Sequence, residues 1–345
     1  MSICLILLLA VTLLGCKVSS FQEDYLSISS STAVKGIFAV LIFYSHISGY
    51  LVLEDTVWNS CFKQILDFFG QLMVVMFLFY SGYGIMESYK HKAKYLETFI
   101  VKRFIRTLLH FVIAVALFIC VQTSLGNVFS WKQYLFCWLG WESVGNSNWF
   151  VFDILCLYII SFVGLLLANF TSSYSKKNNL LLAGVVISLL SVIFWLVLRN
   201  VKDSWWYDTI AVFPLGMWVS IFKDYVDNFL SKKHFSFFLV AITMIVFLAD
   251  RYFVGIDHHG LCACLFSIFF VALTSKVKFD NIVLQWLGRN AFYIYILQRI
   301  PMIIFANFNL NNNVALFVIL VSAVTLVLAE IFSILTKRMD AILFE

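Results

Sequence analysis

The sequence predicts an all-α polytopic membrane protein, with a ten-helix bundle core and one short N-terminal hydrophobic helix. Of the 345 residues, 62% are hydrophobic and only 12% are charged, a balance far outside that of soluble domains. Continuous apolar runs long enough to cross a bilayer recur from end to end, and only two prolines interrupt the chain. No polar stretch is long enough to fold separately. We therefore expect an N-terminal helix and connector (residues 1–24) followed by one membrane domain (residues 25–345).

The apolar runs define the expected helices in order. The first run is the short N-terminal helix, and each later run is expected to form one helix of the bundle. These runs lie at residues 2–16, 33–53, 67–86, 105–123, 149–169, 180–198, 208–222, 235–254, 260–274, 282–306 and 314–335.

Basic residues gather in alternate loops, which predicts the orientation of the chain. The segment "ESYKHKAKYLETFIVKRFIR" (residues 87–106) is rich in lysine and arginine and is therefore expected on the cytoplasmic side. The later loops on that side also carry cations, at residues 176–177, 223–233, 276–278 and 337–338. The opposite loops hold only scattered cations, so one orientation satisfies the whole chain.

The first segment, "MSICLILLLAVTLLGCK", raises the question of processing. Its "LLGC" resembles the cleavage site of a bacterial lipoprotein signal, but no lysine or arginine precedes the apolar stretch. Cleavage would place residues 17–32 outside and set every basic loop on the wrong face. We therefore expect an uncleaved helix with its N-terminus outside.

The segment "KGIFAVLIFYSH" places an ionisable residue at each end of an apolar run. Lys35 and His46 are eleven residues apart, so a helix brings them onto one face with the imidazole about 16 Å deeper. Lys35 is expected at the cytoplasmic mouth, where snorkelling to the interface is the alternative explanation. An imidazole inside a membrane indicates a functional site, although hydrogen bonding to a neighbouring helix also explains it. As a base or proton relay, His46 suits a transferase or a transporter.

Two arginines end the basic segment at 87–106. Arg103 and Arg106, three residues apart in "RFIR", are expected on one face of a helix. Anchoring at the cytoplasmic interface explains them. The functional alternative is recognition of a phosphate-bearing donor, for which guanidinium is well shaped.

Polar side chains within two other runs are further candidates. Ser81 and Gly82 in "MFLFYSGYG" allow close helix packing, and no nucleophile elbow surrounds the serine. In "NWFVFDILCLY", Trp149 is expected as an interfacial anchor, with Tyr158 deeper in the helix. Asp153 needs a partner at its depth and could orient His46 if their helices pack together.

Metal and redox chemistry have little support in the sequence. The eight cysteines lie mostly in apolar runs without metal-binding spacing. The adjacent His258 and His259 point in different directions and lack a third ligand at metal spacing. No metal and no tightly bound cofactor is therefore expected, and His110 and Glu330 remain intramembrane candidates without a supporting motif.

The order of these motifs resembles the acyltransferase 3 family of bacterial membrane acyltransferases over nearly all of residues 25–335. The resemblance rests on the spacing of Lys35 and His46, on "MFLFYSGY", on Arg103 and Arg106, and on three later segments: "NWFVFDILCLY", "FPLGMWV" and "WLGRNAFYIYILQ".

This resemblance implies transfer of an acyl group, commonly acetyl, from cytoplasmic acyl-coenzyme A to a hydroxyl of an envelope carbohydrate in the bacterial inner membrane. His46 would be the base or acyl relay, Lys35, Arg103 and Arg106 the donor-side cations, and Ser81 and Asp153 supporting groups. The implied partners are acyl-coenzyme A, a carbohydrate acceptor, membrane lipids and a separate glycan-modifying protein, with no nucleic acid.

Three departures from the family pattern affect these expectations. Lys35 stands where arginine is more usual, which replaces a bidentate fork with a point charge. Gln298 stands where many members have histidine, and the proline that often follows the arginine pair is missing from "RTLLHF". A proton-coupled transporter of envelope intermediates remains the alternative function, although no internal repeat supports it.

Overall fold

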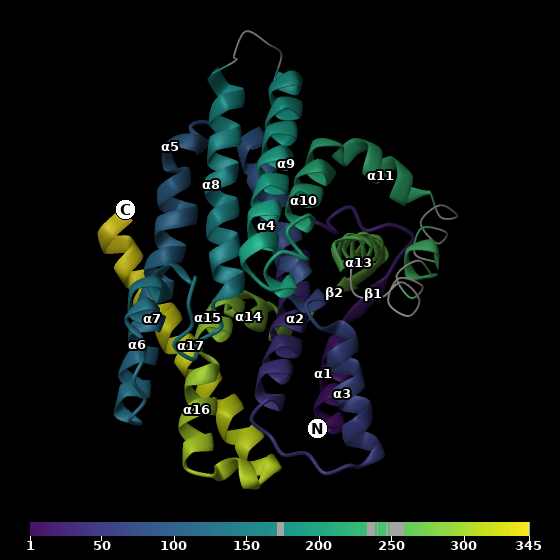
Figure 1. Ribbon diagram of the computed structural model, residues 1–345. Helices are drawn as coiled ribbons and strands as arrows, with labels where there is room; N and C mark the ends of the chain where they lie inside the picture. The colour runs from purple at the N-terminus through teal and green to yellow at the C-terminus, as the bar shows by residue number, and fades with distance from the viewer. Residues whose placement is uncertain (171–175, 233–238, 240, 246–247, 249–258, 345) are drawn as a thin grey trace.

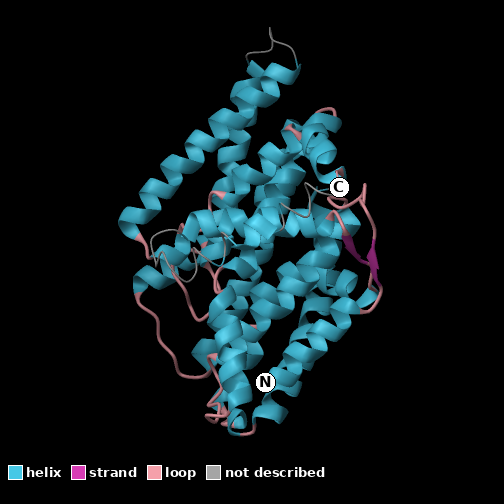
Figure 2. Cartoon of the chain, turned by 90° about the vertical axis from the view of Figure 1, so that its right-hand side faces the viewer, coloured by secondary structure: helices cyan, strands magenta, loops and turns pink. Residues whose placement is uncertain are grey.

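Helices form nearly all of the chain that the computed structural model describes, which is residues 1–344 except 171–175, 233–238, 240, 246–247 and 249–258 (Figures 1 and 2). Within these residues, six helical segments are long and apolar enough to span a membrane: 28–48, 57–91, 95–124, 149–170, 178–201 and 314–344. Four shorter apolar helices accompany them. The all-α, multi-pass class is confirmed, while the ten-helix count stays a prediction. Most of the expected helix at 235–254, and His258 in the loop after it, lie outside the described residues.

Two short strands join the N-terminal region to a segment in the last quarter of the chain. The sequence did not predict them. Strand β1 (Cys16–Val18) pairs antiparallel with β2 (Val277–Phe279), with Lys17 opposite Lys278. Figure 2 shows the pair at one edge of the molecule. The N-terminal helix α1 (Ser2–Leu13) comes just before β1, so this pairing helps to hold α1 against the bundle.

The second and third apolar runs form helices with bounds that differ from the prediction. Helix α2 (Ile28–Ser48) begins five residues earlier than expected, because the Ser27 hydroxyl accepts a hydrogen bond from the Ser30 amide and caps it. Helix α3 (Val57–Phe69), which was not predicted, precedes α4 (Leu72–His91). The two are separated at Gly70, whose φ of 45° suits glycine.

The next runs form three long helices of the bundle, α6, α8 and α9. A short helix α5 (Tyr95–Phe99) leads through a π-helical turn (Ile100–Ile105) into α6 (Arg106–Ser124). After α7 (Trp131–Phe136), α8 (Trp149–Phe170) and α9 (Lys176–Val201) pack against each other along their length (Figure 1). Both agree with the predicted runs at 149–169 and 180–198. Short 3₁₀ turns follow α7 and α9, at Cys137–Leu139 and Ser204–Trp206.

Helices α4 and α10 (Val212–Ile221) cross at close range, and glycine permits it from both sides. A Cβ atom at Gly82 would collide with the carbonyl oxygen of Phe213, and one at Gly216 with that of Phe79. Gly82 therefore acts in helix packing. Helices α11 (Lys223–Ser231) and α13 (His259–Thr274) follow in the chain.

The expectation of one continuous helix at 282–306 is wrong. The run is divided into α14 (Ile282–Arg289), α15 (Ala291–Leu297) and α16 (Arg299–Asn307). The reason lies at the first break, where Gly288 packs so closely on the Thr32 carbonyl of α2 that a Cβ atom would not fit. Asn290 then reaches Glu330 of α17 (Val314–Phe344), with Nδ2 and Oε2 3.2 Å apart. A 3₁₀ turn (Leu310–Asn312) connects α16 to α17.

Figure 1 shows how these pieces are arranged. Helices α14 and α15 lie across the middle of the molecule, next to α2. Helix α5 and the far ends of α8 and α9 lie toward one end, whereas the N-terminus and α16 lie toward the other. The basic segments at 87–106 and 176–177 therefore lie toward the same end, as the predicted orientation requires.

Candidate active site

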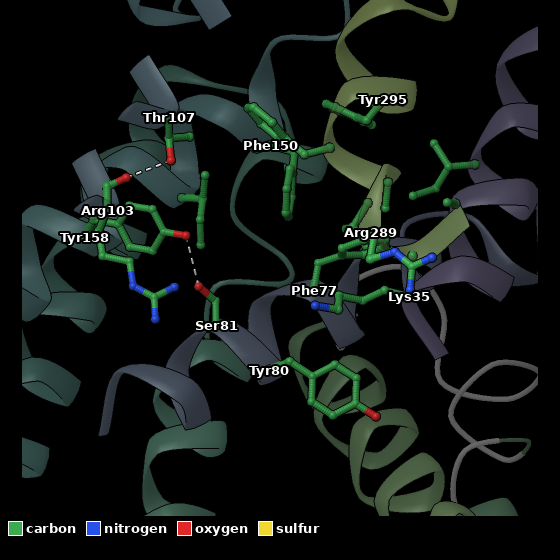
Figure 3. Close-up of a pocket in the computed structure, with 17 residues that line it drawn as sticks. Lys35, Phe77, Tyr80, Ser81, Arg103, Thr107, Phe150, Tyr158, Arg289 and Tyr295 are labelled. Atoms are coloured by element: carbon green, nitrogen blue, oxygen red, sulfur yellow. Dashed lines mark hydrogen bonds between the residues drawn. The ribbon is translucent and has the colours of Figure 1, made fainter. Parts of the chain in front are cut away.

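A polar cavity of about 380 Å³ opens between α2, α4, the π-helical turn, α6, α8 and the α14–α15 break (Figure 3). Its volume falls in the range of small-molecule sites. Apolar side chains form much of its wall. The polar and charged groups come from six elements: Lys35, Tyr80, Ser81, Arg103, Thr107, Tyr158, Arg289 and Tyr295.

The cavity contains three cations and no acid. Lys35 and Arg289 project from one side in the view of Figure 3, and Arg103 lies on the opposite side, near Ser81. Lys35 lies close enough to Arg103 for electrostatic repulsion. Among the described residues, none of these three cations forms a salt bridge. Holding like charges together in an apolar surrounding costs free energy, which an anionic ligand would offset.

Lys35 lies deeper than the sequence suggested. Because α2 begins at Ile28, Lys35 is seven residues inside the helix, about 10 Å from its start. Its side chain is half-buried and lines the cavity. The expected position at the mouth of the helix is therefore corrected: Lys35 is part of an internal site.

Arg103 and Arg106 do not act as a pair. Arg103 lines the cavity, near the hydroxyls of Tyr95 and Tyr158. The Arg106 guanidinium instead lies 5.3 Å from the centre of the Phe344 ring, and Arg106 is absent from the cavity wall. The π-helical turn explains the correction, because its wider i→i+5 turn rotates positions three residues apart away from each other. The predicted shared face applies only to a regular α-helix.

Ser81 and Tyr158 meet across the cavity wall. The Ser81 hydroxyl donates a hydrogen bond of 3.2 Å to the Tyr158 hydroxyl (Figure 3). The contact joins α4 to α8, at the residue directly before Gly82 of the α4–α10 crossing. Trp149 opens α8 and packs against Phe150, which lines the cavity, while Trp149 itself does not.

His46 is not part of the cavity wall; it lies behind Tyr295 and is held by Gln298. The Gln298 side-chain nitrogen is 2.8 Å from Nδ1 of His46, and Gln298 is fully buried. The rings of His46 and Tyr295 have centroids 6.1 Å apart, and Tyr295 also lines the cavity. Tyr295 therefore connects the imidazole to the cation-lined space, and Arg299 lies near enough to His46 to influence it electrostatically.

The expectation that Asp153 orients His46 is wrong. Gln298 is the hydrogen-bond partner of the imidazole, and neither Asp153 carboxyl oxygen has a hydrogen-bond partner among the described residues. Asp153 is fully buried on α8, and Tyr295, whose ring faces His46, lies within electrostatic range of it. Tyr295 is thus near both His46 and Asp153, between which a direct contact was expected.

Sequence reasoning missed several polar residues of this site, of which Arg289, Tyr295 and Gln298 matter most; Tyr80 and Thr107 of the wall were also not foreseen. A signal was present, since Arg289 is a cation inside the apolar run 282–306. That run was taken for one helix, so the break that turns Arg289 and Tyr295 toward the cavity was not foreseen. Gln298 was noted only as a missing histidine, although its amide occupies the place next to His46.

The fold and the cavity define a multi-pass membrane protein with a buried cationic site. A family model described as an acyltransferase domain matches residues 28–334, nearly the whole chain. The chain belongs to this family, acyltransferase 3, and is a membrane acyltransferase. No curated protein and no solved structure matches the chain significantly. Membership favours the transferase over the transporter alternative.

Proposed function

We propose that this protein transfers an acyl group, acetyl in the simplest case, from cytoplasmic acyl-coenzyme A to a hydroxyl of a surface polysaccharide or its lipid-linked precursor. The reaction would take place in the inner membrane of a bacterium. The observation that carries the proposal is the cavity with Lys35, Arg103 and Arg289 and no acid in its wall. Three cations without an anion suit a donor that carries phosphates.

The three cations have distinct parts in binding the donor. The guanidinium groups of Arg103 and Arg289 can each hold a phosphate oxygen pair, and Lys35 adds a point charge. A cavity of about 380 Å³ accommodates part of a coenzyme A molecule, such as its acylated arm, more readily than the whole. In this proposal the thioester points toward Tyr295 and His46, and the nucleotide stays at the cytoplasmic end.

His46 would remove the proton from the acceptor hydroxyl as that oxygen attacks the thioester carbonyl. To act as a base at Nε2, the imidazole must carry its proton on Nδ1 and donate it to the Gln298 side-chain oxygen. In the orientation shown, the amide nitrogen faces Nδ1 and the oxygen has no partner among the described residues. A half-turn of the amide exchanges the two atoms and prepares the base. The thiolate of coenzyme A leaves, and the proton on His46 can neutralise it.

Ser81, in the cavity wall, and Asp153, buried behind it on α8, would support this chemistry. Asp153 lies within electrostatic range of Tyr295, so a protonated Asp153 would avoid a buried charge beside the ring. Ser81, through its hydrogen bond to Tyr158, would fix the wall next to Arg103. Neither residue is assigned a bond-making step.

The proposal is tested with purified protein in lipid nanodiscs, given acetyl-coenzyme A with a labelled acetyl group. We expect free coenzyme A to appear only when an acceptor glycan is added, and the label to move to that glycan. Lys35→Ala should raise KM for the donor, whereas Lys63→Ala, which removes an exposed cation on α3, should not. Absence of acceptor-dependent release across envelope glycans from the native cell would reject the proposal.

A further inference from the structure

A second cavity, of about 480 Å³, lies on another side of α2 and is almost entirely apolar. It is bounded by α2, α14, α15 and α17. Its wall is made of side chains such as Val40, Phe43, Trp286 and Leu326. The wall also contains Tyr44, Ser322 and Thr325, but no charged group. This composition differs from that of the polar cavity and suggests a different occupant.

The second cavity is flanked by aliphatic side chains that the fold leaves uncovered. Ile282 is 82% exposed, and Val283 and Leu326, which also line the cavity, are 48% and 37% exposed. Helices α2 and α17 both have the length and composition of membrane spans. An opening lined by exposed aliphatic side chains on such helices is suited to contact with lipid hydrocarbon.

Water is a poor occupant for this space. The Thr325 hydroxyl is buried, with 1% of the residue exposed, and has no hydrogen-bond partner among the described residues. Thr336, on the same helix, instead donates to the Phe332 carbonyl at 2.8 Å. A buried water needs two to four polar partners; the wall offers only three hydroxyls, of which Tyr44 already donates to the Cys4 carbonyl at 3.2 Å, so water can be held in only a small part of the cavity of about 480 Å³. An alkyl chain fills an apolar cavity of this kind by van der Waals contact.

We propose that the second cavity binds one hydrocarbon chain of a membrane lipid, which enters sideways from the bilayer. The site adjoins the polar cavity, because Ala39 lies in the wall of both and its small side chain makes the partition thin. A chain bound here lies against the helix that carries Lys35 and His46. The site would hold its lipid whether or not the polar cavity performs acyl transfer.

Photocrosslinking tests the site directly. The full-length protein is placed in nanodiscs containing a phospholipid with a diazirine on its acyl chain, irradiated and mapped by mass spectrometry. We expect adducts on Val40, Phe43 and Leu326 in preference to Ile319, which is 65% exposed on α17 but outside the cavity. Equal labelling of Ile319 and the cavity residues would overturn the proposal.

A matched pair of variants on α17 makes the test specific. Leu326→Trp fills the cavity and should reduce labelling of Val40 and Phe43 severalfold. Val327→Trp adds the same ring to a neighbouring position that is 58% exposed and outside the cavity, and should not. If Leu326→Trp fails to fold, Val283→Trp fills the space from α14. Undiminished labelling in a folded filling variant would reject the site.

Competition identifies the source of the chain. Unlabelled polyprenyl phosphate, added in excess, should displace the probe if the cavity selects an isoprenoid chain. Displacement by added phospholipid alone would assign the site to bulk lipid. Either pattern supports a hydrocarbon site, whereas labelling that neither lipid reduces would show that the probe reacts without binding in the cavity.

Discussion

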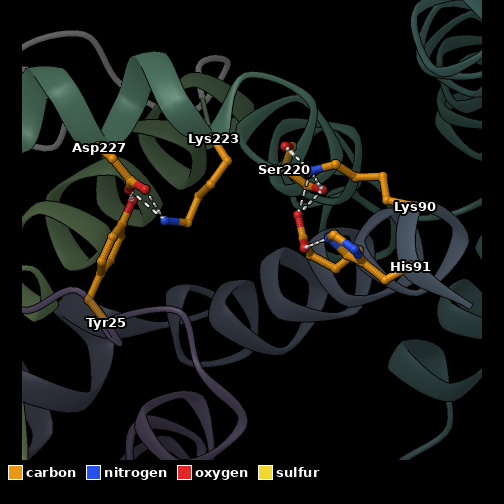
Figure 4. A network of polar contacts seen from close by, with 7 residues as sticks. Tyr25, Lys90, His91, Ser220, Lys223 and Asp227 are labelled. Atoms are coloured by element: carbon orange, nitrogen blue, oxygen red, sulfur yellow. Dashed lines mark hydrogen bonds and ion pairs between the residues drawn. The ribbon is translucent and has the colours of Figure 1, made fainter. Parts of the chain in front are cut away.

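Cations inside the polar cavity differ from cations outside it in whether a carboxylate of the protein pairs with them. Inside, Lys35, Arg103 and Arg289 share a cavity without an acid. At the periphery, Figure 4 shows Lys90 bound to Glu87 at 2.7 Å, and Lys223 paired with Asp227. The charges of these peripheral lysines are neutralised by carboxylates of the protein itself. The internal cations are left to a ligand, so substitutions inside should impair catalysis and those outside should change stability slightly.

In the peripheral network of Figure 4, charged side chains have hydrogen-bond partners within the protein. Glu87 accepts hydrogen bonds from Lys90 and from the Ser220 hydroxyl, both at 2.7 Å, which joins α4 to α10. The Tyr25 hydroxyl donates to Asp227 at 2.9 Å, and burial together with this carboxylate raises the pKa of Tyr25. Among the described residues, no carboxylate forms a salt bridge with the three cations of the cavity.

Replacement of His46 should have the largest effect. In the proposed mechanism His46→Ala removes the base, so kcat for acyl transfer should fall by about 10²–10⁴-fold. The measurement is acceptor-dependent release of coenzyme A by the purified variant. Unchanged acetylation of envelope glycans in cells carrying a correctly inserted His46→Ala protein would remove His46 from the mechanism.

The two arginines provide a sharper test of the inside–outside contrast. Arg103→Lys should raise KM for acyl-coenzyme A by about ten- to a hundredfold, because a charge-assisted hydrogen bond to a buried ligand is lost. Arg106→Lys is the matched control, since Arg106 faces Phe344 and lies outside the cavity wall. Equal effects of the two changes on donor KM would contradict the separation seen at the π-helical turn.

The Gln298 variants test how His46 is oriented. Gln298→Leu removes the partner of Nδ1 and should reduce kcat about tenfold with little change in donor KM. Gln298→Glu keeps an acceptor for an Nδ1 proton, so it should retain much more activity if His46 is a base at Nε2. Equal losses in both variants would mean that the amide must donate to the ring, and that His46 does not act as this base.

The sequence predicted the inner face of α2 better than the rest of the site. Eleven residues of α-helix bring Lys35 and His46 onto one face, whatever surrounds the helix; Lys35 lines the cavity, and His46 lies beside Tyr295, which lines it too. The predictions for Arg106 and for the run 282–306 were wrong for a common reason. A π-helical turn and a helix break depend on tertiary packing, such as Gly288 against Thr32, that no local pattern records.

The smallest effect is expected at a peripheral pair, Lys278 and Asp24. Their Nζ and Oδ2 atoms are 2.6 Å apart, and the Asp24 side chain is 45% exposed, so the pair is worth at most about 1 kcal/mol. The hydrogen bond to Asp24 raises the pKa of Lys278 above its ordinary value of 10.5. The stabilisation is therefore fully present below that value and is lost as the pH rises through the folded-state pKa.

Asp24→Asn should accordingly lower the thermal unfolding temperature slightly at pH 8. The difference from wild type should shrink as the pH rises through the raised pKa of Lys278, because the lysine then loses its charge in both proteins. Acyl transfer at neutral pH should be unchanged, because Lys278 pairs with Asp24 at the periphery and is not part of the cavity wall. A loss of transfer comparable to that of Arg103→Lys would show that peripheral cations also serve the donor, and the contrast between paired and unpaired cations would no longer separate stability from catalysis.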